Sequence, residues 1–327
     1  ESWNGTNWTS VAALNTGRAM MGGAGADNTS ALGFGGSPYS ASTEEFNTGV
    51  AIGAWSTGGS LNTARDQLAG AGTQTSALAF GGRPDTGKTE SYNGTSWTEV
   101  NDLITARNDL GGVGVSNTAA LAFGGDLNPG TNTELWNGTN WTAVNALQTA
   151  GGKIGASAGI QTSALAIGGE RPLAVSPTVN VESWNGTNWT EVNNTNTVKD
   201  LAAGAGADNT AAIAFGGNVS PKANTELWNG TNWTEVNDLN TGRDNLASAG
   251  TSTAALAFGG SAPPVTGKTE IWNGTNWTET TDLTIARASL GGAGTNTAAL
   301  AFGGTPPFLT ATEEWNDPGT ITKTLTT

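Results

Sequence analysis

The sequence contains no cysteine and no histidine among its 327 residues. Without cysteine the chain can form neither disulfides nor thiolate metal sites. Without histidine it lacks the commonest general base and metal ligand, and it lacks any imidazole switch near pH 6. These absences exclude many classes of catalytic and metal site, and we expect no cofactor.

Charged residues and long apolar runs are also scarce. Only 12% of the residues are charged, and 13 Lys and Arg against 27 Asp and Glu give a net charge of −14. Such a surface repels phosphate backbones and anionic lipids, so we expect neither a nucleic-acid partner nor membrane insertion. No stretch approaches the about 18 apolar residues of a membrane span, and no signal peptide is visible.

Glycine and tryptophan are abundant, at 49 and 13 residues, and 36% of the chain is hydrophobic. Low charge with this apolar content is typical of a folded chain rather than a disordered one. The chain begins at Glu1, in the middle of a repeat. We therefore expect a processed product or an excerpt of a longer polypeptide.

Two short phrases recur along the whole chain. Glu-x-aromatic-Asn occurs eight times, with its aromatic residue at Trp3, Phe46, Tyr92, Trp136, Trp184, Trp228, Trp272 and Trp315. Phe or Ile followed by Gly-Gly occurs seven times, ending at Gly36, Gly82, Gly125, Gly169, Gly217, Gly260 and Gly304. The aromatic spacings of 43, 46, 44, 48, 44, 44 and 43 residues match the length of one four-stranded propeller blade.

One unit, residues 243–279, shows the expected strands in order. Residues 245–250 are mostly small, which suits the innermost strand, where blades converge. Residues 254–258 are apolar enough to be buried on both faces. Residues 268–272 and 276–279 form the outer pair around Asn273-Gly274, which predicts a type I′ hairpin turn with positive φ at both positions.

The order Arg, double Gly, aromatic, Trp resembles the kelch repeat over essentially all 327 residues. Short hairpins, Trp in place of Tyr and Thr/Asn-rich turns depart from the usual kelch pattern. The variant Trp-Asn-Gly-Thr-Asn-Trp-Thr with Ala-Leu-Ala-Phe-Gly-Gly is similar to repeat proteins of tailed phages of marine bacteria. The resemblance implies an all-β fold.

Counting the phrases predicts a single seven-bladed β-propeller over residues 1–327. The blades are expected to start near residues 18, 65, 107, 151, 199, 243 and 287. The eighth aromatic phrase is split between the two ends, and one terminus of a propeller often supplies a strand to the blade built by the other. We therefore expect residues 1–12, around Trp8, to complete the last blade, with Ile321–Leu325 as the competing candidate.

A basic residue begins six of the seven units: Arg18, Arg65, Arg107, Lys199, Arg243 and Arg287. In the fourth unit the aligned position is Gly151, with Lys153 two residues later. A ring of these cations around one mouth of the channel would attract anions. The alternative is that each pairs with the one Glu that its unit offers, among Glu44, Glu90, Glu134, Glu182, Glu226, Glu270 and Glu313. The recurrence of both partners favours pairing.

The outer strands carry a second set of tryptophans: Trp8, Trp55, Trp97, Trp141, Trp189, Trp233 and Trp277. These could stack on sugar rings, as in propeller lectins. They could instead fill the space between neighbouring blades, where each would bury a large apolar area. Their recurrence in every unit favours the second interpretation.

The segments after the double glycines vary in length and sequence while the frame stays constant. They are Ser37–Ser42, Arg83–Lys88, Asp126–Asn132, Glu170–Asn180, Asn218–Asn224, Ser261–Lys268 and Thr305–Ala311. We expect them on the same face as the basic residues, either as a recognition surface on a rigid scaffold or as tolerated surface variation. The longest, with Arg171, Leu173 and Val175, is the best single candidate for a binding loop.

The sequence gives little support for glycosylation or for an enzyme active site. Asn-x-Ser/Thr triplets such as Asn4-Gly5-Thr6 mostly fall in hairpin turns, which explains them without glycosylation. Copper-dependent galactose oxidase needs Cys, Tyr and His, and the sialidase Ser-x-Asp-x-Gly-x-Thr-Trp box is absent. A glycosidase built on paired carboxylates is not strictly excluded.

The sequence thus predicts a protein that is not an enzyme but a structural or binding module. The first hypothesis is a virion component of a phage, such as a tail fibre or surface decoration, that binds other virion or surface proteins. The alternative is a secreted lectin that binds a host-surface glycan. Both place the chain in a virion or outside the cell.

Overall fold

The structure is a computed structural model. It describes the backbone of residues 2–3, 8–9, 22–27, 30–34 and 43–47, and it describes residues 53–317 apart from 85–86, 127–129, 150–151, 172–173 and 221. Of residues 171 and 174–177 only the backbone is described. The chain divides into two compact units, one made of residues 1–52 and 318–327, the other of residues 53–317.

The first unit contains two small antiparallel sheets. Strand β1 (Ser2–Trp3) pairs with β2 (Trp8–Thr9). Strands β3 (Gly22–Asp27), β4 (Ser30–Phe34) and β5 (Thr43–Asn47) form a three-stranded sheet in the order β3-β4-β5. These are the first three strand positions of a repeat, since β4 precedes a double glycine and β5 carries the aromatic phrase.

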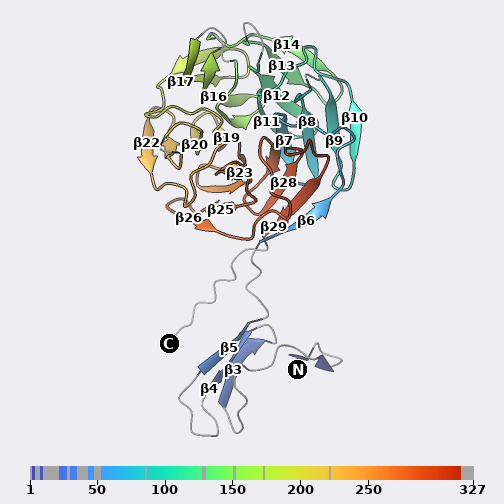
Figure 1. The fold of residues 1–327 in the computed structure, drawn as a ribbon, viewed down its shortest axis with the longest axis vertical. Coiled ribbons are helices and arrows are strands. Elements are labelled where there is room, and N and C mark those ends of the chain that lie inside the picture. The colour runs from blue at the N-terminus through green and yellow to red at the C-terminus, as the bar shows by residue number, and fades with distance from the viewer. Residues whose placement is uncertain are drawn as a thin grey trace. The chain divides into compact units, whose positions relative to one another are not determined.

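The second unit is a β-propeller of six four-stranded antiparallel blades around a central axis (Figure 1). Blades 1 to 3 are β7–β10 (Ala69–Thr73, Ser76–Phe80, Thr89–Tyr92, Trp97–Val100), β11–β14 (Gly111–Ser116, Ala119–Phe123, Thr133–Trp136, Trp141–Val144) and β15–β18 (Ala156–Ile160, Ser163–Arg171, Ala174–Trp184, Trp189–Val192). Blades 4 and 5 are β19–β22 (Ala203–Asp208, Ala211–Phe215, Thr225–Trp228, Trp233–Val236) and β23–β26 (Ala247–Thr251, Ala254–Phe258, Thr269–Trp272, Trp277–Glu279). Blade 6 is β27 (Gly291–Gly294), β28 (Ala298–Phe302), β29 (Thr312–Asn316) and β6 (Ala54–Gly58).

The prediction of seven blades is wrong, and the propeller has six. Strands β3–β5 of the first repeat belong to the other compact unit, so that repeat adds no blade to the ring. The sequence offers a physical reason. The two aromatic residues of an outer pair are five positions apart in the other repeats, as in Tyr92 and Trp97, but Phe46 and Trp55 are nine apart. The short connection that makes a hairpin is therefore missing there.

The closing strand is also different from the predicted one. Strand β6 is the outer strand of blade 6, and its Trp55 lies opposite Trp315 of β29. The principle that an N-terminal segment closes the ring holds, but the predicted segment around Trp8 is wrong, because β2 pairs with β1. The competing candidate, Ile321–Leu325, lies outside the described residues.

Small residues allow the innermost strands to approach one another closely. A Cβ atom on Gly112 would lie 2.7 Å from the Cβ of Ala69 in the preceding blade and 2.7 Å from the ring of Phe80. Ser248 donates a 2.7 Å hydrogen bond to the carbonyl of Gly204 on the neighbouring inner strand. Larger side chains would force the blades apart, because close-packed interiors leave no room for added atoms.

The outer hairpins form where the sequence predicts them, but not as type I′ turns. Gly274 has φ of 91°, whereas Asn273 is absent from the positive-φ residues of the described chain. Instead, Asn273 Oδ1 accepts hydrogen bonds from the backbone N–H groups of Thr275 and Asn276. The asparagine side chain thus stabilises the turn as a local cap, which explains why the position is Asn in nearly every unit.

Candidate functional site

The recurrent cations that the structure describes are buried and paired, not displayed at a channel mouth. Four arginines and one lysine have at most 1% of their surface exposed: Arg65, Arg107, Lys199, Arg243 and Arg287. Each forms an ion pair with the glutamate of its own blade, respectively Glu90, Glu134, Glu226, Glu270 and Glu313. The pairing interpretation is therefore confirmed for these five. Arg18 lies outside the described residues, as does the side chain of Glu44.

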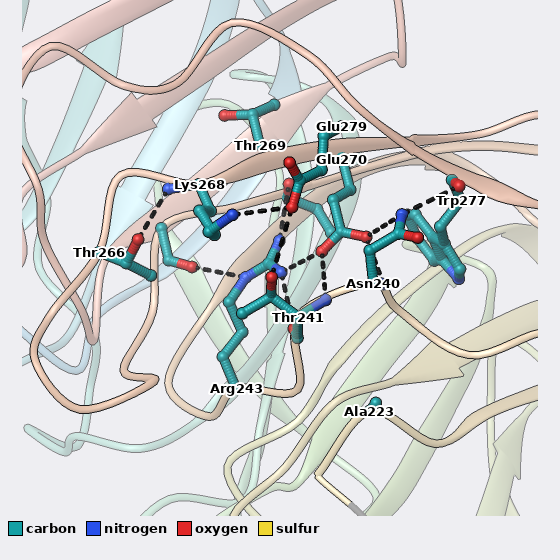
Figure 2. A network of polar contacts seen from close by, with 12 residues as sticks. Ala223, Asn240, Thr241, Arg243, Thr266, Lys268, Thr269, Glu270, Trp277 and Glu279 are labelled. Atoms are coloured by element: carbon teal, nitrogen blue, oxygen red, sulfur yellow. Dashed lines mark hydrogen bonds and ion pairs between the residues drawn. The ribbon is translucent and has the colours of Figure 1, made fainter.

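The pair in blade 5 shows how one cation joins three parts of a blade (Figure 2). Arg243 binds Glu270 and also donates to the carbonyl oxygens of Gly259 (3.0 Å) and Ala257 (3.3 Å). Glu270 in turn accepts the backbone N–H groups of Asn240 (2.7 Å) and Thr241 (3.4 Å). The pair therefore fastens residues 240–243, which lead into the blade, to its second and third strands.

Blades 1, 2 and 6 repeat this arrangement with arginine, and blade 4 has it with lysine. In blade 4 the cation is Lys199, whose Nζ lies 3.4 Å from Glu226 and donates to Asn224 as well. Burial lowers the pKa values of Arg65, Arg107, Arg287 and Lys199, and the neighbouring glutamates oppose that change. Buried pairs of this kind leave no charge for an external anion.

The outer-strand tryptophans lie between blades. Trp277 packs edge-on against Phe215 of the preceding blade, with ring centroids 4.7 Å apart, and donates to Thr225 Oγ1. Trp97 does the same with Phe302 and Thr312, which joins blade 1 to blade 6. The six described members are buried: Trp55, Trp97, Trp141, Trp189, Trp233 and Trp277. The packing interpretation is confirmed, and these faces are not open to a sugar.

Trp233 is the exception that shows how the contact is built. Its neighbour in blade 3 is Ile167 instead of Phe, and Val181 stands where the other blades have Thr. The indole N–H of Trp233 therefore donates to the carbonyl of Asn193 at 3.1 Å. A buried indole N–H needs an acceptor, and the chain supplies a different one.

In the six blades, each loop after a double glycine is fastened at its root by the same backbone hydrogen bond, while the predicted loop Ser37–Ser42 lies outside the described residues. The first loop residue donates its N–H to the carbonyl of the residue that follows the conserved cation position of its blade. The six bonds, 2.7–3.0 Å long, are Arg83 to Asp66, Asp126 to Asn108, Glu170 to Lys153, Asn218 to Asp200, Ser261 to Asp244 and Thr305 to Ala288. The loops therefore leave the propeller at one end, as predicted.

The same bonds show that blade 3 has one more residue in the segment that leads into it. Counted back from Lys153, which anchors its loop as Asp66 and Asp244 do, the residue equivalent to Arg65 and Arg243 is Gly152. Counted forward from Thr149, whose N–H binds Glu182 as that of Thr241 binds Glu270, it is Gly151, as predicted. Lys153 itself pairs with Glu170 of the loop at 2.9 Å. Blade 3 therefore has no cation in the frame position.

The loops expose both charged and apolar side chains. Arg83 makes a bidentate contact with Asp66 while half of its side chain stays exposed, and Lys222 reaches Asp244 at 2.9 Å. Phe308 is 49% exposed and Val219 is 37% exposed. In the longest loop, β16 and β17 extend through Arg171 and Ala174 as a continued hairpin. Leu173 and the side chains of Arg171 and Val175 lie outside the described residues.

At the same end, a ring of backbone hydrogen bonds surrounds the channel mouth. Five links are present in the described chain: Asp109 to Gln67, Ile154 to Asp109, Asn245 to Leu201, Ser289 to Asn245 and Gln67 to Ser289, each from N–H to carbonyl at 2.8–3.0 Å. Five of the six ring residues have φ between 51° and 53°, a left-handed conformation unusual for residues other than glycine. The sequence analysis missed this ring. In four of the six blades the available signal was a polar residue just before the leucine that precedes the inner strand.

Asp109 is the ionisable residue among the six ring residues, and its pKa is shifted. Its pKa is raised to about 7, mainly by burial and to a smaller extent by nearby Asp126 and Asp66, against the opposing effect of Lys153 and Arg83. Asn108 donates to its carboxylate at 3.3 Å. The neutral and charged forms of Asp109 are therefore both accessible near neutral pH.

The channel behind this ring is small. Its cavity has a volume of about 220 Å³ and is lined by the six inner strands and the ring residues. Sites for drug-sized ligands are usually about 300–1,000 Å³. The channel therefore has room for several water molecules but not for a large ligand. Among the described residues, no cluster of three or more carboxylates is arranged to hold a metal ion.

Comparison with known proteins supports the fold and nothing finer. No protein-family model matches the chain, and no curated protein matches it. The solved structure of YjhT matches with a TM-score of 0.63 at 11% identity, covering 78% of this chain and 95% of that chain. The described part of the chain contains no helix with the length and apolar character needed to span a bilayer. The chain is thus similar to a known β-propeller with four-stranded blades.

Proposed function

We propose that this protein is a non-enzymatic binding module that presents its variable loops, at the channel-mouth end, to a protein partner. The observation that carries this proposal is a division of roles within each blade. The residues that recur are buried in the frame as ion pairs and tryptophan contacts, whereas the residues that differ leave at one end from a common anchor. Recognition surfaces on rigid scaffolds are built in this way.

The partner that we propose is another virion or surface protein, with this chain as a phage fibre or decoration. The support is the kelch-like, Trp-Asn-Gly-Thr-Asn-Trp type of the repeat. Exposed Phe308 and Val219 add apolar surface to the loop face, and aromatic anchors contribute strongly to protein interfaces. A lectin that uses the outer tryptophans is disfavoured by their burial, and a glycan array tests whether the loops bind sugar instead.

A photo-crosslinking experiment tests the proposal. A benzophenone amino acid replaces Phe308 on the loop face, and in a control protein it replaces the exposed Thr139 in an outer hairpin. Mass spectrometry of the intact source particle then identifies the crosslinked neighbours. We expect a specific adduct from position 308 and none from position 139. An adduct from position 139 alone would place the interface on the rim and contradict the proposal.

A further inference from the structure

The frame of this propeller is a repeated guanidinium-binding site. In blades 1, 2, 5 and 6 a buried carboxylate holds an arginine, and in blade 4 it holds a lysine. In all six blades the same carboxylate accepts two backbone N–H groups from the segment that leads into the blade. The chain thus shows four times that this geometry binds a guanidinium group, and once that it binds an ammonium group.

Blade 3 retains this geometry and lacks the cation. Glu182 pairs with Ala166 in the register that Glu270 shares with Ala257. Its two carboxylate oxygens accept the N–H groups of Gln148 and Thr149, each at 2.8 Å. The position that carries the cation in the other blades is Gly151 when counted from Thr149 and Gly152 when counted from Lys153, and neither glycine has a side chain.

The residues around the Glu182 carboxylate are slightly more exposed than their counterparts in the other blades. Ala166 is 6% exposed, whereas its five counterparts, Ala79, Ala122, Ala214, Ala257 and Ala301, are completely buried. Gly168 is also partly exposed, although the equivalent Gly81 and Gly259 are buried. Glu182 is 4% exposed, against 0–2% for the other five glutamates. These small differences fit the absence of the cationic side chain that covers the other five carboxylates.

The electrostatic environment also suits a cation. Burial raises the pKa of Glu182, the nearby Glu191 raises it further, and only hydrogen bonds from Gln148 and Thr149 oppose the change. In the other blades a buried cation supplies the missing stabilisation. The net charge of −14 further favours the approach of cations over anions.

We propose that the Glu182 carboxylate, with the space left by Gly152, binds the guanidinium group of an external ligand. The group takes the place that Arg243 occupies in blade 5, with charge-assisted hydrogen bonds to Glu182 and to the carbonyl of Ala166. The ligand is either a small alkylguanidinium compound or an arginine side chain of a partner polypeptide. This site is independent of the proposed docking of a partner on the loops, and each can fail alone.

Calorimetric titration with methylguanidinium chloride tests the site. We expect one site with a dissociation constant on the order of a few millimolar, because so small a ligand offers few contacts. Tetramethylammonium chloride, which cannot donate hydrogen bonds, serves as the control for ionic strength. Glu182→Gln should weaken binding at least tenfold, and Gly152→Arg should abolish it by supplying the group from within. Absence of binding to the unmodified chain, or equal binding by Gly152→Arg, overturns the proposal.

A matched variant keeps the test decisive if Gly152→Arg does not fold. Arg243→Gly converts blade 5 into a copy of the blade 3 arrangement around Glu270. This variant should unfold at a lower temperature and be restabilised by methylguanidinium more than by tetramethylammonium. Failure of methylguanidinium to restabilise it, when the unmodified chain also shows no binding, contradicts the proposal.

A second titration distinguishes the two sources of the guanidinium. L-arginine amide is compared with a blocked Gly-Arg-Gly peptide, whose flanking backbone can contact the loops. Equal affinities indicate a site for a small compound, and tighter binding of the peptide indicates a partner's arginine side chain. In either case the Glu182→Gln variant must weaken the binding, and no effect of that variant rejects the site.

Discussion

At the scale of single residues, the frame depends on pairs that are costly to break. Arg243 and Glu270 are both completely buried, and each holds backbone groups of other segments. Both residues occur in the repeat, so their pairing could be predicted from the sequence. The two N–H groups that Glu270 accepts could not, because they come from a segment about 30 residues earlier that only the fold brings close.

Removing one member of this pair should destabilise the propeller strongly. Arg243→Ala leaves Glu270 buried without its cation, and we expect a loss of about 3–5 kcal/mol of unfolding free energy. Glu270→Ala likewise leaves Arg243 buried without its anion. The double variant Arg243→Met with Glu270→Leu should lose less unfolding free energy than either single alanine variant, because no charge remains unpaired. Urea unfolding of the unmodified protein and these three variants measures the losses, and a loss in the double variant as large as the sum of the two single losses would contradict the coupling.

Asp109 should make stability depend on pH. Its pKa is about 7 in the folded chain and about 4 in the unfolded chain, so between these values the folded state binds more protons. Unfolding free energy should therefore fall as pH rises from about 4 to about 7 and level off above that range. Asp109→Asn should remove this contribution, so that the unfolding free energy of the variant, relative to that of the unmodified protein, increases between pH 5 and pH 8. A difference that stays constant across this range would contradict the assignment.

At the scale of elements, the double glycines join each blade to the next. Gly260 has φ of 107°, and a Cβ there would lie 2.7 Å from the carbonyl of Asp244. Its N–H donates to the carbonyl of Arg287 in the following blade. The recurrence of Gly-Gly showed that the backbone must bend or pack closely there. Which segment it packs against followed only from the structure.

Two glycine variants separate backbone strain from close packing. Gly274→Ala in the outer hairpin meets a left-handed φ of 91° and a carbonyl oxygen, that of Thr253, at 3.3 Å from the new Cβ, and should cost about 1–2 kcal/mol. Gly260→Ala meets a similar φ and also the nearby Asp244 carbonyl, and should cost clearly more. Thermal unfolding compares them, and equal losses would show that packing at the double glycine has no effect.

At the scale of the whole molecule, one strand decides whether the ring closes. Strand β6 pairs with β29, and its Trp55 also packs against Phe258 of blade 5. The strand lies more than 250 residues from its partner in sequence. Residues 53–317 therefore contain every strand of the six blades.

Truncation tests this closure. A chain of residues 53–317 should fold cooperatively as a propeller, whereas residues 60–317 lack β6 and expose the edge of β29 and the side of Trp315. We expect the shorter chain to lose at least about 3 kcal/mol, the usual cost of removing one buried tryptophan, or to aggregate through the open edge. Circular dichroism during heating provides the measurement. Equal melting temperatures would contradict closure by β6.

The sequence by itself determined the blade, because strand alternation, turn residues and recurrent buried pairs act over a few tens of residues. It therefore predicted four strands per blade, the ion pairs, the tryptophan contacts and a single loop face. The number of blades and the closing strand were decided by the tertiary structure, since they depend on which of several similar edges pair across the whole chain. For Glu182 the sequence already showed that its unit lacks the cation, whereas the burial of the carboxylate and the two N–H groups that it accepts were decided by the tertiary structure, because they depend on segments that only the fold brings together.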